Sequence, residues 1–204
     1  MENLQTSKKE LKNELNLSFK KLGFKSVSNS FYKKENNFFL HPMIDIKKVK
    51  SNLIIKFWIL IKPYEYDNLF WTLLDMKENI NSRDSLRANG AFVSPSMKLS
   101  ELEWTISEFK NIPELCNEIS QQVTKVYDEF LNSIDMNLDI FNDRVLNSTN
   151  YFRDKLLKMI AHLQKKDFHT AFLLSSEELF NGKRGGFQNN GKDIYEYIKE
   201  YTQK

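Results

Sequence analysis

The sequence predicts a single α+β domain over residues 1–204, with an N-terminal helix, an antiparallel sheet of about three to five strands and a helical C-terminal half. Three patterns support this prediction. Apolar residues recur at helical spacing near the N-terminus, alternate at every second position between residues 31 and 61, and return to helical spacing beyond Pro113. We expect the sheet-rich part to cover about residues 1–108 and the helical part about residues 109–204.

The first helix is predicted over residues 7–22. Ser7 and Glu10 have the spacing of a capping box, in which each side chain satisfies a backbone N–H group that is free at a helix start. Gly23 is suited to the left-handed conformation that commonly ends a helix. The apolar face of this helix consists of Leu11, Leu15, Phe19 and Leu22.

Three strands in meander order are expected between residues 31 and 61. Asn36–Asn37 and residues 50–52 mark the two turns, and such short connections favour antiparallel pairing. Pro42 cannot donate to a sheet ladder, which predicts an edge position or a bulge there. The segment 53–61 is apolar on both faces and is expected to be a central strand.

The middle of the chain has weaker patterns. Asp67 could cap a helix that carries apolar residues up to Met76 and fades in the polar run 77–89. Residues 91–93 and 101–106 could each add a short strand.

The C-terminal half is predicted to be helical. A continuous apolar stripe from Leu115 to Ile134 indicates one long amphipathic helix. Two further helices, over residues 150–163 and from Phe168 to Leu179, are joined by a short turn at 165–167 and should form a helical hairpin.

Composition and charge exclude several classes of protein. Thirty basic and 27 acidic residues give a net charge of +3 with mixed signs, a weaker basic excess than dedicated nucleic-acid binders usually show. Cys116 is the single cysteine, which fits a reducing cytoplasm and precludes an internal disulfide. The first 13 residues lack the apolar region of a secretory signal, and the run 53–61 is too short to span a bilayer.

We expect no catalytic, cofactor-binding or metal-binding site. His41, His162 and His169 lack a recognised ligand spacing, although the last two flank a predicted turn and could approach each other. Two acidic pairs, Glu101 with Glu103 and Glu177 with Glu178, could divide acid and base roles only if burial separated their pKa values. Cys116 has no local partner and is expected to be a small core residue. An enzyme would need several of these groups to converge in one pocket.

The segment 182–187 is the most suggestive local feature. It combines three glycines with Lys183 and Arg184, which could contact a phosphate, and with Phe187, which could stack on a base. The segment lacks the spacing of a nucleotide-binding P-loop and no strand precedes it. The alternative is a mobile surface loop over residues 180–192, followed by a final helix over 192–201.

The order of these signals resembles a known family. A capped helix that ends in Gly23–Phe24 is followed by Phe31–Lys34, by Trp104 ahead of a helical tail, and by residues 163–168 with Ala171 near the end. This pattern is similar to the small bacterial proteins of the domain of unknown function 4304 family. The resemblance implies a fold and a bacterial cytoplasmic setting, and it implies no functional residues.

Two functions follow as hypotheses. The first is a non-catalytic protein that binds a protein partner, such as an immunity-type or accessory protein, because aromatic residues are abundant and commonly anchor interfaces. The alternative is nucleic-acid or nucleotide binding through Lys183, Arg184 and Phe187, which predicts salt-dependent affinity. The sequence does not specify an oligomeric state.

Overall fold

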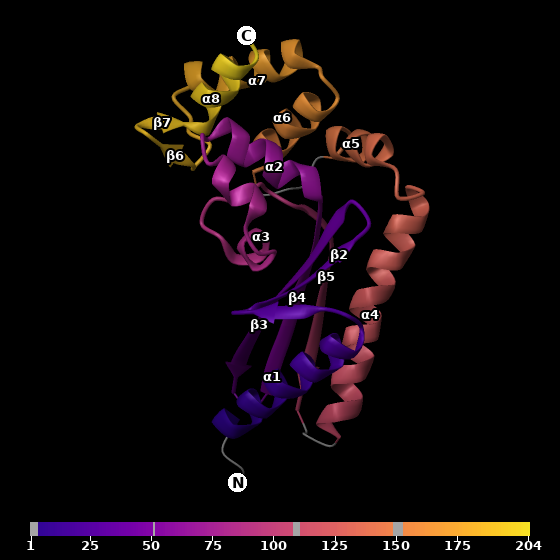
Figure 1. The fold of residues 1–204 in the computed structure, drawn as a ribbon. Coiled ribbons are helices and arrows are strands. Elements are labelled where there is room, and N and C mark those ends of the chain that lie inside the picture. The colour runs from indigo at the N-terminus through magenta and orange to yellow at the C-terminus, as the bar shows by residue number, and fades with distance from the viewer. Residues whose placement is uncertain (1–3, 51, 108–110, 149–152) are drawn as a thin grey trace. The chain divides into compact units, whose positions relative to one another are not determined.

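The computed structural model describes residues 4–50, 52–107, 111–148 and 153–204 (Figure 1). The described residues form eight helices, one short 3-10 helix, a five-stranded antiparallel sheet and a two-stranded hairpin, which confirms the α+β class and the N-terminal helix. The chain divides into two compact units. The first contains residues 1–61 and 98–135, and the second contains residues 62–97 and 136–204. That the chain is a single domain over residues 1–204 stays a prediction.

The first unit is built on the sheet. Its strands follow in sequence order as neighbours, so the expected meander is confirmed and extended by one strand at each edge. Ser51, within the turn predicted at 50–52, lies outside the described residues. The strands are β1 (Lys25–Val27), β2 (Ser30–Glu35), β3 (Phe38–Val49), β4 (Asn52–Pro63) and β5 (Met97–Ile106). The last two residues of β4 and the first residue of β5 belong to the second unit.

Two helices pack against this sheet, namely α1 (Leu4–Lys21) and α4 (Ile112–Ser133) (Figure 1). The Phe19 ring of α1 stacks on Phe31 of β2 with centroids 4.1 Å apart. The Tyr127 hydroxyl of α4 donates to the Leu60 carbonyl oxygen at 2.9 Å, which satisfies a polar group at a buried position. Every second residue of β4 faces this interior: Leu53, Ile55, Phe57, Ile59 and Ile61.

The predicted N-terminal cap at Ser7 and the predicted edge position of Pro42 are wrong. The first helix is already formed at Leu4, so Ser7 lies inside it and is not its N-terminal cap. Pro42 lies in β3, which pairs with β2 and β4 and is therefore not an edge strand. The register of β3 against β2 is the same on both sides of Pro42, with Ser30 opposite Met43 and Lys33 opposite Leu40, so no residue is inserted on that side.

The second unit is mainly helical. The predicted helical hairpin is confirmed as α6 followed by α7, and α7 also packs against α8 (Figure 1). Residues 150–152, in the predicted start of α6, lie outside the described residues. The elements are α2 (Tyr64–Leu73), the 3-10 helix η1 (Lys77–Asn81), α3 (Ser85–Asn89), α5 (Leu138–Leu146), α6 (Asp154–Gln164), α7 (Phe168–Phe180), β6 (Gln188–Asn189), β7 (Lys192–Asp193) and α8 (Ile194–Tyr201).

The sequence predictions for this unit need three corrections. Helix α2 begins at Tyr64, directly after Pro63, so Asp67 lies inside the helix and does not cap it. Residues 91–93 form no strand. The segment 180–192, expected to be a mobile loop, contains β6 and the first residue of β7, which pair as a hairpin.

Candidate functional site

The glycine-rich segment 182–187 is held in a defined turn. The backbone N–H of Gly185 donates to both carboxylate oxygens of Asp193, at 3.0 and 3.1 Å. A Cβ atom at Gly185 would lie 2.2 Å from Cγ2 of Ile194, so the close approach requires glycine. The Gly185 N–H group already donates to a carboxylate of the protein, so it is not available to bind a phosphate in this conformation.

Phe187 does not have the role that the sequence suggested. Its side chain is buried, with the residue 5% exposed. Its ring packs edge-on against Phe70, with centroids 4.8 Å apart, and the Arg153 guanidinium lies 4.1 Å from its centroid. Because neighbours already cover the ring, Phe187 cannot stack on a nucleic-acid base in this conformation.

Lys183 and Arg184 are more than half exposed, and each lies near a carboxylate. Lys183 Nζ is 3.8 Å from Glu178, and Arg184 Nη1 is 3.4 Å from Glu196. Glu196 also accepts a hydrogen bond from the backbone N–H of Asp193 and completes the capping box of α8. The positive charges of the two residues are thus partly compensated within the protein.

The three histidines have separate surroundings. His41 is buried in β3, with Nε2 3.2 Å from the Ser30 hydroxyl. Nδ1 of His162 lies 3.0 Å from Asp167, which caps α7 by accepting from the Thr170 N–H. Although His162 and His169 flank the same turn, His162 has the capping carboxylate as its partner.

Three of the four acids in the two predicted pairs, Glu101, Glu177 and Glu178, lie beside a lysine. Glu101 lies 2.5 Å from Lys56, and the hydrogen bond from that lysine holds the pKa of Glu101 below its usual value. Glu178 lies 2.8 Å from Lys155, and Glu177 lies 3.7 Å from the same ammonium group.

Cys116 is a core residue, as the sequence predicted. It is fully buried in α4, and burial raises the pKa of its thiol to about 12. The thiolate form that nucleophilic chemistry requires is therefore negligible at neutral pH.

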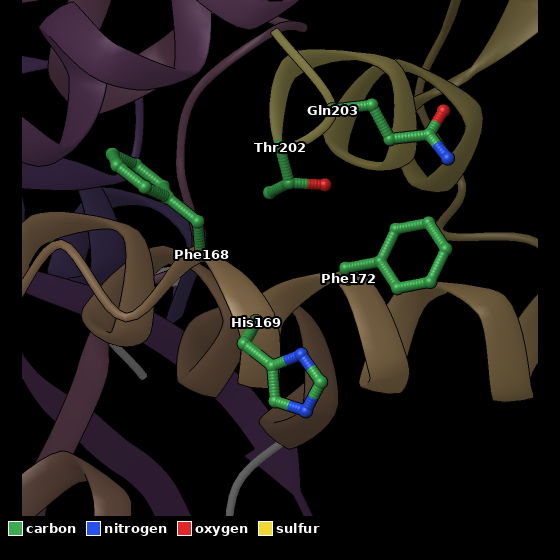
Figure 2. Close-up of a pocket in the computed structure, with 5 residues that line it drawn as sticks. All are labelled: Phe168, His169, Phe172, Thr202 and Gln203. Atoms are coloured by element: carbon green, nitrogen blue, oxygen red, sulfur yellow. The ribbon is translucent and has the colours of Figure 1, made fainter.

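An open hollow lies between the start of α7 and the end of α8 (Figure 2). Its volume is about 350 Å³. Phe168 and Phe172 of α7 supply aromatic walls, and Thr202 and Gln203 lie across from them, directly after α8. His169 lies at the rim. The hollow is open to solvent, and aromatic and polar side chains line it alike.

One face of α7 next to this hollow carries the exposed apolar side chains of Leu173 and Phe180, and the polar residues Ser176 and Glu177 lie between them on the same side of the helix. His169, Leu173 and Phe180 follow each other on one helical face by their spacing, and we call these three residues the α7 outer stripe. Leu173 is 51% exposed and Phe180 is 91% exposed. The opposite face of the helix is buried through Ala171 and Ser175. Packing within the second unit therefore does not account for the exposed Leu173 and Phe180 side chains.

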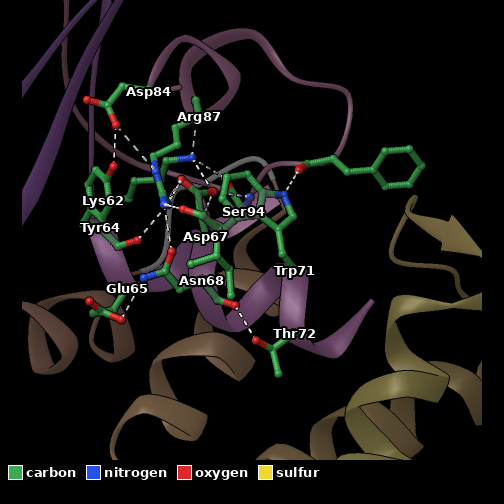
Figure 3. Close-up of polar contacts among 12 residues, drawn as sticks. Lys62, Tyr64, Glu65, Asp67, Asn68, Trp71, Thr72, Asp84, Arg87 and Ser94 are labelled. Atoms are coloured by element: carbon green, nitrogen blue, oxygen red, sulfur yellow. Dashed lines mark hydrogen bonds and ion pairs between the residues drawn. The ribbon is translucent and has the colours of Figure 1, made fainter. Parts of the chain in front are cut away.

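A buried ionic cluster in the second unit was not predicted from the sequence (Figure 3). Oδ1 of the fully buried Asp67 accepts from Lys62 Nζ at 2.8 Å and from the Ser94 N–H and hydroxyl at 2.9 and 2.8 Å. Oδ2 of Asp67 lies 3.5 Å from Nη1 of Arg87. Burial lowers the pKa of Lys62, and the Asp67 charge acts in the opposite direction.

The Arg87 side chain is enclosed by α2. Its guanidinium lies 3.7 Å from the Tyr64 ring centroid and 4.7 Å from that of Trp71, and it donates to Oδ1 of Asn68 at 2.8 Å. These contacts hold the 84–94 segment against α2 and give the cluster a structural role (Figure 3). A lysine directly after the apolar strand segment is the one sequence signal that could have indicated it.

None of the helices in the described part of the chain combines the length and the apolar character that crossing a bilayer requires. Among the described residues, no group of three or more histidine, cysteine, aspartate or glutamate side chains is placed to hold a metal ion. Comparisons of the chain with family models, with curated proteins and with solved structures give no match. The resemblance to the domain of unknown function 4304 family stays a prediction.

Proposed function

We propose that this chain is a non-catalytic protein of the bacterial cytoplasm that binds a protein partner, and that the partner contacts the α7 outer stripe. The exposure of Phe180 and Leu173 on one helix face carries the proposal. Large apolar side chains that gather on a surface commonly mark protein-binding sites, whereas single ones need no explanation. Phe168, at the start of the same helix, is also 42% exposed, so the apolar surface extends into the hollow.

The surroundings of the reactive groups support a binding role over a catalytic one. Glu101, Glu177 and Glu178 of the two predicted acidic pairs lie beside lysines, and Cys116 is buried with a raised pKa. These groups lack the accessible, unengaged state that acid–base or nucleophilic chemistry needs.

The same surroundings favour a protein over a nucleic acid as the partner. The loop cations Lys183 and Arg184 each lie near a carboxylate, and Phe187 is covered. Nucleic-acid binding depends on uncompensated cations along a phosphate backbone, which this loop does not present.

The test is affinity capture from native cells with in-cell crosslinking, using the full chain and a stripe variant, L173E/F180E. Both side chains are exposed, so the variant should fold normally. Burying an anchor side chain at an interface typically contributes 2 kcal/mol or more, so the variant should recover its partner at a level lower by on the order of 30-fold.

A matched control is L17E/V49E, which changes two exposed apolar residues of the first unit. This control should capture the partner at the wild-type level. Equal recovery by the stripe variant and the wild type, or loss of capture in both variants alike, would contradict the proposed role of the stripe.

A further inference from the structure

We propose that the first unit binds the phosphate backbone of a nucleic-acid duplex through five lysines of α1 and β3. We call these residues the lysine face: Lys8, Lys9, Lys12, Lys20 and Lys48. The proposal goes beyond the proposed function and does not rest on it, because the lysine face lies in the first unit and the α7 outer stripe lies in the second. It is supported by the local charge, the placement of the five lysines and the positions of the nearby acids.

The N-terminal part of the chain is strongly basic. Residues 1–61 contain 12 lysines, no arginine and five acidic residues, which gives a net charge of +7. Residues 62–204 contain 18 basic and 22 acidic residues, so the net charge of +3 for the whole chain conceals the basic excess. Nucleic-acid binding depends on cations that gather on one surface, and the local excess supplies them.

The four α1 lysines lie on one flank of the helix. At 3.6 residues per turn they fall within an arc of about 120°, and no acidic residue of α1 falls within that arc. Lys9 and Lys20 are exposed, and among the described residues neither forms an ion pair. Between these two lysines the helix rises by about 16 Å at 1.5 Å per residue. A DNA duplex presents roughly ten phosphate charges over that length, at one per 1.7 Å of its axis.

Hydrogen bonds join this flank of α1 to the rest of the sheet unit. Lys8 Nζ donates to the Ile46 carbonyl oxygen of β3 at 2.7 Å, and Lys12 Nζ donates to Oδ1 of Asn29 at 3.0 Å. Ile46 is buried, and Lys48 follows it on the same side of the strand, where it is exposed. The Lys48 charge is therefore added next to the α1 lysines. Neutral oxygen acceptors leave the ammonium charges of Lys8 and Lys12 uncompensated.

The acids of α1 and β3 lie on other sides of these elements. Burial and, after it, the Glu14 charge raise the pKa of the Cys116 thiol, which places Glu14 on the flank of α1 towards α4. Glu10 precedes Glu14 by one helical turn and lies on the same flank. Asp45 points to the opposite side of β3 from Lys48, and its carboxylate lies 2.9 Å from Lys47. The lysine face is thus free of carboxylates from its own two elements.

The other side chains of α1 favour a duplex over a single strand or a membrane. Asn13 and Asn16 lie beside the lysines, and amide groups commonly contact phosphate and sugar. Phe19, the one aromatic residue of α1, is fully buried, so α1 offers no ring on which an unpaired base could stack. Among the α1 side chains that the structure describes, Leu17 is the one large apolar side chain that is exposed. A helix that lies on a membrane buries a whole apolar face.

The test is fluorescence anisotropy of labelled DNA and RNA duplexes with the full-length protein. If about five phosphates are neutralised, raising the salt concentration from about 50 to about 200 mM should weaken DNA binding about 500-fold, because the slope of log K against log salt is about −4.5. The variant K9Q/K20Q/K48Q removes three exposed cations. It should reduce the steepness of that slope by about 2.7 and lower the affinity at about 50 mM salt at least tenfold.

Three controls locate the binding surface. The matched variant K77Q/K125Q/K166Q removes three exposed cations outside the lysine face and should keep the wild-type affinity and salt slope. The variant K183Q/R184Q, in the glycine-rich segment, should do the same. The stripe variant L173E/F180E should also bind the duplexes normally, so a failure of the proposed function is distinguishable from a failure of this inference.

Several results would overturn the inference. These are the absence of binding to both duplexes at about 50 mM salt, an equal salt slope for the wild type and K9Q/K20Q/K48Q, and an equal loss of affinity in any control. Tighter binding of a single-stranded oligonucleotide than of either duplex would overturn the duplex as the ligand. Binding to phosphatidylserine vesicles that depends on the three lysines, without binding to a duplex, would assign the lysine face to a lipid surface instead.

Discussion

Replacing Asp67 by alanine should destabilise the second unit more than any other single loss of charge in its buried ionic cluster. The Asp67 carboxylate is fully buried and is the acid that Lys62 and Arg87 share, since it lies 2.8 Å from the first and 3.5 Å from the second. Its removal leaves two buried cations without this counterion. The Ser94 N–H and hydroxyl also lose their acceptor.

The expected cost is about 3–5 kcal/mol, the usual consequence of removing one partner from a buried ion pair. Natural domains have unfolding free energies of about 5–15 kcal/mol, so this loss is a large fraction of the total. With a urea dependence of about 2 kcal/mol per molar, a loss of 4 kcal/mol lowers the unfolding midpoint by about 2 M. The variant D67N keeps the shape of the side chain and should fall between the wild type and D67A.

The fluorescence of Trp71 provides the assay, because this α2 residue packs against the Arg87 guanidinium of the cluster. In a W58F/W104F background it is the single tryptophan, so its fluorescence during urea unfolding reports on the second unit. The control is D143N, which removes a half-exposed partner of Lys165 in the same unit and should change the midpoint little. A D67A midpoint within experimental error of the D143N midpoint would refute a stabilising role for the cluster.

Three further predictions concern single residues. Cys116 should stay unmodified by a thiol reagent at pH 8 in the native protein and react fully in denaturant, because burial raises its pKa to about 12; fast native labelling would contradict this. G185A should lower the free energy of unfolding by about 1–3 kcal/mol through overpacking against Ile194, as measured by urea unfolding, and an unchanged midpoint would argue against the tight approach. The pKa of Asp167 is lowered, chiefly by its hydrogen bond with Thr170. The stabilising effect of the Asp167 carboxylate should therefore be present above the ordinary carboxyl pKa and be lost as the pH falls through the lowered pKa. Titration followed by carbon NMR should show the lowered pKa of Asp167, and an ordinary carboxyl pKa would contradict the prediction.

The elements that the sequence predicted best are those specified by local periodicity. Helix α4 was predicted from a stripe of apolar residues that follows Pro113, and Pro113 lies in the first turn of the helix. The meander of β2, β3 and β4 was predicted from apolar residues at every second position and from two short turns. Each pattern lies within one stretch of chain, so no knowledge of distant contacts is needed.

The features that the sequence did not predict depend on contacts between distant residues. Asp67 has the chemistry of a helix cap, and its partner Ser94 lies 27 residues away, so local rules could not place its carboxylate inside the protein. Phe187 was expected to be accessible and Phe180 was not singled out, yet Phe187 is covered by Phe70 and Phe180 is exposed. The neighbouring sequence of these two rings does not distinguish them, because the covering groups come from other elements.

The way the chain passes between the two units has a consequence for its synthesis. The first unit consists of two separated stretches, and residues 62–97 of the second unit are inserted between them. On the ribosome, β5 and α4 emerge only after this insertion, so the sheet cannot acquire its last strand and its long covering helix until residue 135 has been made. Residues 62–97 likewise cannot complete the second unit until α5 to α8 have been synthesised. Expressing either unit alone would require joining stretches that are not consecutive in the natural chain.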